Sequence, residues 1–434
     1  MACFPIPHQH GHVFRMAFCY CGRTLLANDA VHKKLIALQN PRTFFSSTLF
    51  SKDFGIGRQR LNYGLSKAVH SLSSSGLSTS AQNAQSPVFD SDICENKPAS
   101  TSLPNGRVML IDGTSIIYRA YYRLIAKLHH GHLSNADGNG DWVLTIFNAL
   151  SLIIDVLEFI PSHVAVVFDH DGVPYGHVSS ERSFVAKGMN FRHTLYPAYK
   201  SNRSPTPDTV VQGLQYLKAS LKAMSIKVIE VPGVEADDVI GTLAIRSVND
   251  GFKVRVVSPD KDFFQILSPS LRLLRIAPRG FEMSSFGLED FAEKYGSLKP
   301  SQFVDVIALM GDRSDNIPGV DGIGNAHAVQ LITKFGSLEN LLDCADQVQE
   351  DRIRKSLIES SEQAILSKNL AMLRSDLPFY MVPFATKDIA FSKPEDDGEK
   401  FKSLLTAISA YAEGFSADSI IRRTLSLWKK IESQ

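Results

Sequence analysis

From residue 107 onward, short runs of apolar residues alternate with segments whose apolar residues recur every three or four positions. The apolar runs predict buried strands at 107–113, 163–169, 227–232, 253–262 and 271–277. Helical periodicity lies near 115–128, 141–159, 207–224 and 235–249, and it dominates from about residue 286 to the end. Strands that alternate with helices predict an α/β fold, a mainly parallel sheet covered by helices.

Acidic residues follow several of these predicted strands. Nine carboxylates lie at strand ends or in the segments that come next: Asp112, Asp169, Glu235, Asp237, Asp238, Asp260, Asp262, Asp312 and Asp315. Because the carboxyl ends of parallel strands meet at one edge of the sheet, we expect the nine to converge there. We expect Asp260 and Asp262 on one side of an extended segment, and Asp312 and Asp315 on one face of a helical turn.

Such crowding needs a counter-charge, since two unit charges about 4 Å apart repel by roughly 4 kcal/mol at an effective dielectric near 20. For "VEADD" (234–238) alone, acids in a first helical turn that favour the helix dipole are an equal alternative to a bound cation. Caps do not explain a convergent set. Oxygen ligands select Mg²⁺ or Mn²⁺, and two such ions roughly 4 Å apart clamp a phosphate. Neither His nor Cys stands at these positions, which argues against zinc.

The charge of the chain is unevenly distributed. Residues 1–89 carry nine Lys/Arg and two acids, whereas residues 90–434 carry 37 Lys/Arg and 43 acids, so a nucleic-acid surface must be local. The segment 172–206 mixes cations with aromatic residues, which suits a polyanion with stackable bases, although a solvated loop is the alternative. In "GVDGIGNAHAVQLI" (319–332), glycines before a helix favour close phosphate contact, with a packing turn as the alternative.

Residues 1–105 differ from the rest of the chain. They are poor in acids, contain several arginines and become Ser-rich near residue 71, which predicts a mitochondrial or chloroplast transit peptide; a disordered leader is the alternative. Four of the five cysteines lie in this leader, so neither a disulfide framework nor a cysteine zinc site is expected in the body. No apolar run reaches 18 residues, and we expect no membrane partner.

Four motifs in order, "FRHTLYPAYKSNR", "VEADD", "SPDKDF" and "GDRSDNIPGVDGIG", resemble the 5′→3′ exonuclease domain of bacterial DNA polymerase I and related flap-endonuclease-like 5′ nucleases. The resemblance covers about residues 107–390. It implies a leader at 1–105, a PIN-like catalytic domain at 106–285 with a helical arch at 170–206, and a helical subdomain at 286–434 with a helix–hairpin–helix-like motif at 311–335. The chain also resembles a stand-alone plant-type organellar member of this family, which is expected to have no polymerase or proofreading domain.

The same resemblance assigns roles to residues. It makes all nine carboxylates metal-binding: Asp112, Asp169, Glu235 and Asp237 nearer one ion, Asp312 and Asp315 nearer the other, Asp260 and Asp262 between them, and Asp238 within the set. It makes Lys200, Arg192 and Asp260 catalytic, with Arg192 and Lys200 on the scissile phosphate. It implies these DNA-binding residues: Arg192, Tyr199, which stacks on a base, Lys200, Arg203, Gly319, Gly322 and Gly324. A K⁺ ion at the glycine motif is implied too.

The implied function is metal-dependent 5′→3′ exonuclease and 5′-flap endonuclease activity on DNA in organellar replication and repair. The implied partners are DNA with 5′ flaps, nicks or gaps, and RNA primers, with the protein acting as a monomer. Two departures from bacterial members are an insertion at about 171–190 and Asn325-Ala326-His327 where a Lys is common.

Three other functions are compatible with parts of the sequence. A DNA-binding protein with the fold but little cleavage and a PIN-type ribonuclease remain alternatives. A haloacid-dehalogenase-like phosphatase is disfavoured, since "DGT" (112–114) is not its DxD motif.

Overall fold

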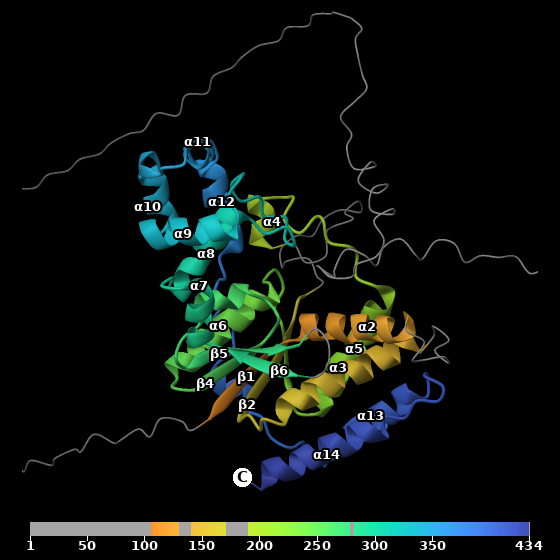
Figure 1. The fold of residues 1–434 in the computed structure, drawn as a ribbon. Coiled ribbons are helices and arrows are strands. Elements are labelled where there is room, and N and C mark those ends of the chain that lie inside the picture. The colour runs from red at the N-terminus through yellow and green to blue at the C-terminus, as the bar shows by residue number, and fades with distance from the viewer. Residues whose placement is uncertain (1–105, 130–139, 171–189, 278–281, 434) are drawn as a thin grey trace, which may run out of the picture. The chain divides into compact units, whose positions relative to one another are not determined.

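A six-stranded sheet lies at the centre of the computed structural model, which describes residues 106–129, 140–170, 190–277 and 282–433 (Figure 1). The strand order is β3-β2-β1-β4-β5-β6; β1 to β5 are parallel, and β6 is antiparallel to β5. The strands are β1 (Arg107–Asp112), β2 (His163–Phe168), β3 (Lys227–Glu230), β4 (Lys253–Val257), β5 (Leu271–Ile276) and β6 (Met283–Phe286). The predicted α/β class is therefore confirmed.

Helices cover both faces of the sheet because successive strand residues alternate between them. Val108 and Leu110 of β1 belong to the hydrophobic cluster on one face of the sheet, and Met109 and Ile111 belong to the cluster on the other face. On the first face lies α6 (Ala236–Asn249); on the other lie α2 (Gly113–His129), α3 (Asp141–Leu157) and α5 (Asp208–Ala223) (Figure 1). Each parallel strand is thus buried on both sides, as its continuous apolar run predicts.

A group of helices follows the last strand. Its members are α7 (Leu288–Tyr295), α8 (Phe303–Met310), α9 (Asn325–Phe335), α10 (Leu338–Asp343), α11 (Asp351–Glu359) and α12 (Ser361–Ala371). Shorter elements are α4 (Phe191–Leu195) and the 3₁₀ helices η1 (Asp262–Ile266), η2 (Pro300–Gln302), η3 (Ala345–Gln347) and η4 (Thr386–Ile389). Helices α8 and α9 pack against each other across the glycine turn, as the hairpin prediction requires.

The last two helices do not belong with this group, which corrects the predicted subdomain at 286–434. The chain returns to the sheet where Ala390 bridges His163 beside β2. Helices α13 (Glu399–Ser409) and α14 (Asp418–Glu432) then pack against α3 and α5 (Figure 1). Their apolar stripes, including Phe401 and Trp428, are buried in the same cluster as α3, so hydrophobic burial places them with the sheet.

Other sequence predictions divide between the described and undescribed residues. Within the described ranges, every predicted strand and helix is present with ends shifted by a few residues, and β6 was missed. The leader 1–105 and nearly all of the insertion 171–190 lie outside them. No helix in the described part of the chain combines the length and apolarity needed to cross a bilayer. The domain boundary at 285 stays a prediction.

Candidate active site

Acidic side chains gather at the carboxyl edge of the sheet. Asp112 ends β1, Asp169 follows β2, and Asp260 comes three residues after β4. Glu235 precedes the first residue of α6, which starts beyond the end of β3. Seven of the nine predicted carboxylates act on one another through Coulomb repulsion: Asp112, Asp169, Asp237, Asp260, Asp262, Asp312 and Asp315. The parallel topology brings Asp112, Asp169 and Asp260 together as the sequence predicts, and the turn after α8 brings Asp312 and Asp315 to them.

Asp112 is held by donors from two elements of the fold. Its carboxylate accepts hydrogen bonds from the Ser115 backbone N–H at 2.8 Å and the Ser258 hydroxyl at 2.8 Å. Burial raises the pKa of Asp112 to about 6, against these hydrogen bonds, and repulsion from Asp169 adds to the rise. The Ser258 oxygen also accepts from the Asp260 backbone N–H at 3.2 Å, so one hydroxyl links the ends of β1 and β4.

Asp237, Asp260 and Asp262 lie next to these groups. Loss of solvent raises the pKa of each, and neighbouring carboxylates raise it further; the pKa values of Asp237 and Asp262 lie well above the ordinary value. Asp262 Oδ1 is buried and has no hydrogen-bond partner. Clustered carboxylates with such an oxygen fit a hard divalent cation. Among the described residues, no three Asp, Glu, His or Cys side chains already stand in ligating positions, so this fit rests on the donor set.

Two local predictions about these acids are wrong. Asp260 and Asp262 do not lie in an extended segment: β4 ends at Val257, Asp262 begins η1, and its backbone N–H donates to Asp260 Oδ1 at 2.9 Å. Asp312 and Asp315 do not lie on a helix. Helix α8 ends at Met310, and Asp312 Oδ1 accepts from the Ser314 backbone N–H at 2.8 Å within a tight turn. Side-chain capping of the backbone thus replaces regular structure at both places.

Lysine and arginine side chains contact carboxylates of this site. Lys200 Nζ lies 3.0 Å from Glu235 and 3.7 Å from Asp315, and its side chain is 17% exposed. Arg203 contacts Asp315 at 2.5 Å, and Lys261 contacts Asp312 at 3.1 Å. Burial alone would raise the pKa of Glu235, yet Lys200 and Arg192 hold it at about 2, so Glu235 remains charged.

The structure places Asp238, Arg192 and Tyr199 differently from the roles that the resemblance implies. Both Asp238 oxygens bind the Arg192 guanidinium, at 2.7 and 2.9 Å, so Asp238 is held in an ion pair with the arginine that also contacts Glu235. Arg192 and Tyr199 are each 3% exposed. The Tyr199 hydroxyl lies 3.3 Å from Glu235 and Asp315. In this conformation Arg192 cannot reach a phosphate and Tyr199 cannot stack on a base, because surrounding atoms cover both.

The three glycines of the predicted DNA-binding motif differ in their exposure and in their contacts. Gly319 is buried; its N–H donates to the Ser367 hydroxyl at 3.1 Å, and its carbonyl accepts from Gln363 at 2.7 Å. Gly319 therefore serves the packing of the turn, which corrects its assignment to phosphate contact. Gly322 and Gly324 are exposed at the N-terminus of α9, and a Cβ added at Gly322 would lie 3.5 Å from the Arg352 guanidinium.

Gly319→Ala should destabilise the protein by about 3 kcal/mol or more, because Gly319 has φ +67° and an added Cβ would lie 2.3 Å from the Gly311 nitrogen. Gly324→Ala is the matched control: nothing lies within 4 Å of its added Cβ, so the free energy of unfolding should change by at most about 0.5 kcal/mol. Urea unfolding of the full chain, followed by circular dichroism, measures both. Equal stability of the two variants would contradict the packing role of Gly319.

Sequence reasoning missed several asparagines that hold this site. Asn190 donates to Glu235 Oε1 at 2.6 Å and caps α4. Asn316, at φ +57°, donates to the Ala198 carbonyl at 2.7 Å, and Asn202 donates to the Arg313 carbonyl at 2.6 Å. The Lys200 N–H donates to the Asp315 carbonyl at 2.9 Å. The turn 196–203 is therefore fastened to the turn 312–317. The only available signal was that Asn202 and Asn316 lie inside motifs and that Asn190 directly precedes one.

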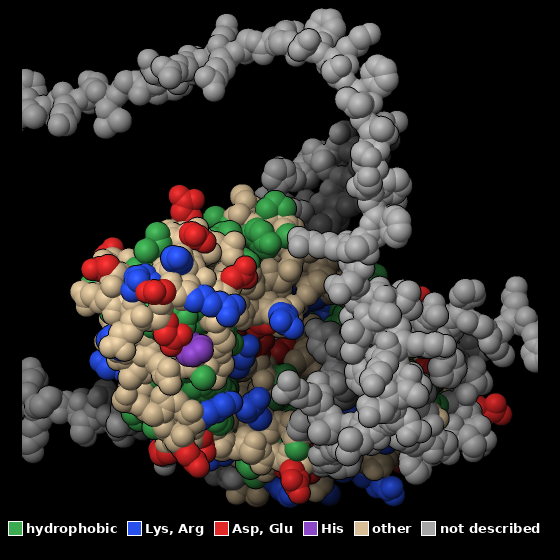
Figure 2. Space-filling model, turned by 45° about the horizontal axis from the view of Figure 1, so that its top comes forward, with side chains coloured by type: hydrophobic (Ala, Val, Ile, Leu, Met, Phe, Trp, Pro, Cys, Tyr) green, Lys and Arg blue, Asp and Glu red, His purple; other side chains and the backbone are tan. Residues whose placement is uncertain are grey.

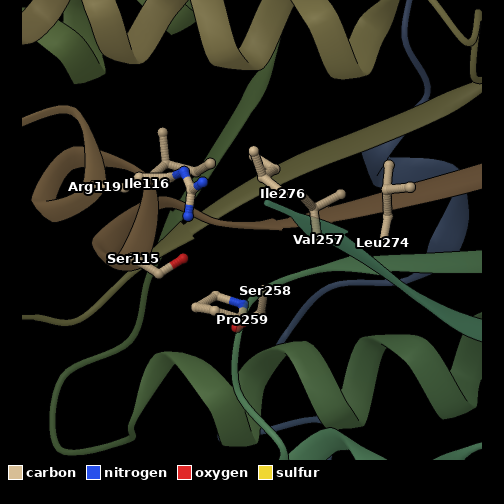
Figure 3. Close-up of a pocket in the computed structure, with 8 residues that line it drawn as sticks. All are labelled: Ser115, Ile116, Arg119, Val257, Ser258, Pro259, Leu274 and Ile276. Carbon is tan, nitrogen blue, oxygen red and sulfur yellow. The ribbon is translucent and has the colours of Figure 1, made fainter. Parts of the chain in front are cut away.

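The cluster opens to the surface and does not fill an enclosed cavity. Figure 2 shows acidic side chains inside a hollow, with Lys and Arg side chains around it. A separate small cavity of about 30 Å³ lies between α2 and the ends of β4 and β5, where Arg119 and Ser115 face Ser258 and Pro259 (Figure 3). A volume of this size holds about one water molecule.

Two protein-family models match the chain in succession. The 5′-3′ exonuclease N-terminal resolvase-like domain matches residues 107–296, and the 5′-3′ exonuclease C-terminal SAM fold matches residues 298–397. The chain belongs to the 5′-3′ exonuclease family. Members of this family are nucleases, and all nine carboxylates of the candidate site fall within the two matches.

Curated relatives of this 5′-3′ exonuclease family chain include bacterial DNA polymerases. The thermostable DNA polymerase I of Thermus filiformis is 38% identical over 275 residues, which is 63% of this chain and 29% of the relative. The DNA polymerase I of Bacillus caldotenax is 36% identical over 300 residues, 69% of this chain and 31% of the relative. The chain thus spans about a third of the length of these relatives.

Among solved structures, the T5 D15 protein co-crystallised with metal ions aligns with a TM-score of 0.47 and 21% identity, over 71% of this chain and 100% of that one. This likeness is too weak to add to the family assignment.

Proposed function

We propose that the chain is a divalent-metal-dependent 5′ nuclease that hydrolyses DNA phosphodiester bonds at 5′ flaps, nicks and gaps. The observation that carries this proposal is the carboxylate cluster at the carboxyl edge of the sheet, with Lys200 between Glu235 and Asp315, in a chain of the 5′-3′ exonuclease family. A site that concentrates negative charge yet keeps a lysine inside it suits a metal-bridged phosphate.

Two Mg²⁺ or Mn²⁺ ions are the proposed cofactors. Eight residues would hold them: Asp112, Asp169, Glu235, Asp237, Asp260, Asp262, Asp312 and Asp315. Bound divalent ions supply Lewis acidity and lower the pKa of water, which makes hydroxide available for in-line attack on phosphorus. Asp238 is excluded from the set by its pairing with Arg192.

The side chains of this protein supply the remaining steps. Lys200 is charged, because Glu235 and Asp315 hold its pKa well above the ordinary value despite burial. Its Nζ can turn from these carboxylates to a phosphate oxygen and stabilise charge that develops in the transition state. Arg203, whose side chain is 45% exposed beside Asp315, can bind the adjacent phosphate.

Duplex DNA is the proposed ligand of the exposed end of α9. The backbone N–H groups after Gly322 and Gly324 and the nearby Arg352 suit phosphate, and a K⁺ ion is part of this proposal. RNA primers are proposed as further substrates and a monomer as the active form.

Cleavage of three labelled DNAs by the full chain tests this function. We expect Mg²⁺- or Mn²⁺-dependent cutting near the junction of a 5′ flap, slower 5′→3′ trimming at a nick and little cutting of a plain single strand. Binding should weaken steeply as salt rises, because several phosphates are contacted. Tight junction binding without cutting would contradict the nuclease proposal, and equal cutting of structured RNA and DNA would favour a PIN-type ribonuclease.

Import into chloroplasts, mitochondria or both is proposed for the leader, because its composition is that of a transit peptide. A fusion of residues 1–105 to a fluorescent protein should enter one of these organelles in plant cells. A purely cytosolic or nuclear signal would contradict the proposal.

A further inference from the structure

We infer that Asp238 and Arg192 are positioning residues that lock the acidic helix α6, the short helix α4 and the segment 370–374 together, and that neither binds metal or phosphate. This inference rests on the proposed function and assigns a different task to two residues of the same motifs. We call the pair and its backbone partners the Arg192 clamp.

Each of the three side-chain nitrogens of Arg192 donates to a protein acceptor. Its Nε donates to the Leu370 carbonyl at 2.9 Å, and one terminal nitrogen donates to the Met372 carbonyl at 2.8 Å as well as to Asp238. The other terminal nitrogen donates to Asp238 and lies 3.4 Å from Glu235. A guanidinium has five N–H groups. Four of them donate to protein acceptors, and the nitrogen that carries the fifth lies beside Glu235, so a phosphate would have to displace one of these partners.

The Asp238 carboxylate is likewise bound by protein donors. Besides Arg192, its Oδ1 accepts from the Arg374 backbone N–H at 2.9 Å, and the residue is 2% exposed. Its neighbour Asp237 faces Asp112, Asp169 and Asp260 instead. Adjacent helix residues point in different directions, so the first turn of α6 sends one carboxylate into the acid cluster and the next into the clamp.

The Arg192 clamp affects the acidic site through residues that lie before and after Arg192 in the chain. Asn190 caps α4 and donates to Glu235, so fixing α4 at Arg192 also fixes this hydrogen bond. From α4 the chain leads directly to the turn that carries Lys200, whose Nζ contacts the same Glu235. A shift of α4 would therefore move both the amide and the ammonium that hold Glu235, while Asp112, Asp237 and Asp260 keep their places.

The test separates positioning from metal binding with neighbouring variants of the full chain. Asp238→Asn should lower the single-turnover rate of flap cleavage at saturating Mn²⁺ by about 10²-fold, a loss typical of small misplacements. Its Mn²⁺ dissociation constant, measured by calorimetry without DNA, should change much less than that of Asp237→Asn, because Asp238 contributes no ligand oxygen and Glu235 keeps its contact with Lys200. Asp237→Asn, the matched control, should weaken Mn²⁺ binding by about tenfold or more.

A double-mutant cycle supplies the second measurement. If Asp238 acts through Arg192, then Arg192→Gln combined with Asp238→Asn should be about as slow as either single variant. Additive losses would mean that the two residues act independently and would overturn the clamp. Weakened Mn²⁺ binding in Asp238→Asn, equal to that of Asp237→Asn, would also overturn it.

Loss of folding has its own control, because removing one partner of a buried ion pair leaves the other charge unpaired. Arg192→Met combined with Asp238→Leu replaces both charges by apolar groups and should keep the helical circular dichroism of the parent. This variant should bind Mn²⁺ as the parent does yet cleave about 10²-fold more slowly. Parent-like cleavage would overturn the clamp. If the parent itself neither binds Mn²⁺ nor cleaves, the proposed function fails and the clamp falls with it.

Discussion

Asp260→Asn should lower the single-turnover rate of flap cleavage by about 10³-fold or more, equivalent to roughly 4 kcal/mol of lost transition-state stabilisation. Asp260 faces Asp262, Asp312 and Asp315, so the change removes a charge from the centre of the proposed metal site. The side-chain oxygen that accepts from the Asp262 N–H is kept, so local structure should persist. Rapid-quench assays at several Mg²⁺ concentrations measure the loss.

The stability of the same variant should move in the opposite direction. Relief of repulsion in the cluster should raise the free energy of unfolding without added metal by about 1 kcal/mol. DNA binding should remain near that of the parent. Asp346→Asn, at an exposed position in η3, is the control and should change neither quantity. A destabilised Asp260→Asn protein that loses DNA binding and cleavage together would show that the acid is structural.

Lys200→Met should slow the chemical step by about 10²–10³-fold, because it removes the ammonium that meets the phosphate while keeping the side-chain length. Metal binding should behave differently. Lys200 neutralises Glu235 and Asp315, so its removal leaves more negative charge, and the Mn²⁺ dissociation constant should stay equal or fall.

Calorimetry and single-turnover kinetics on one protein preparation separate these two effects. Lys400→Ala, an exposed position on α13, should match the parent in both. Weaker Mn²⁺ binding by Lys200→Met, or cleavage within a factor of about three of the parent, would contradict the assignment of Lys200 to phosphate.

The sequence predicted those parts of the site that topology alone determines. Asp112, Asp169 and Asp260 each follow a buried parallel strand, and parallel strands end at one edge, so their convergence needed no knowledge of side chains. The prediction from the sequence was wrong where side chains bind backbone N–H groups and so replace regular secondary structure. Asp260 and Asp312 accept backbone N–H groups, and these local bonds make turns where extended or helical spacing was expected.

The sequence pattern also did not predict contacts between residues that are distant in the chain. The binding of Arg192 to Asp238 and to carbonyls of residues 370 and 372 depends on how α4, α6 and the end of α12 pack. Composition and spacing describe Arg192 and Asp238 as one cation and one of several acids, and nothing in either suggests that they neutralise each other. The prediction that placed α13 and α14 in the helical subdomain was wrong for a similar reason, since helical periodicity does not say which apolar surface a helix covers.

The fastening of the turn 196–203 to the turn 312–317 has a consequence for the order in which the protein matures. Asp112 and Asp169 leave the ribosome long before Asp315, and synthesis adds roughly 5–20 residues per second. Until the later turn emerges, the Lys200 N–H lacks the carbonyl that it meets in the finished fold, and Asn202 lacks the carbonyl of Arg313. A nascent chain can thus form its early strands while its charge cluster is still incomplete. Competence to cut nucleic acid should therefore appear late in synthesis, after the helices that follow the sheet have been made.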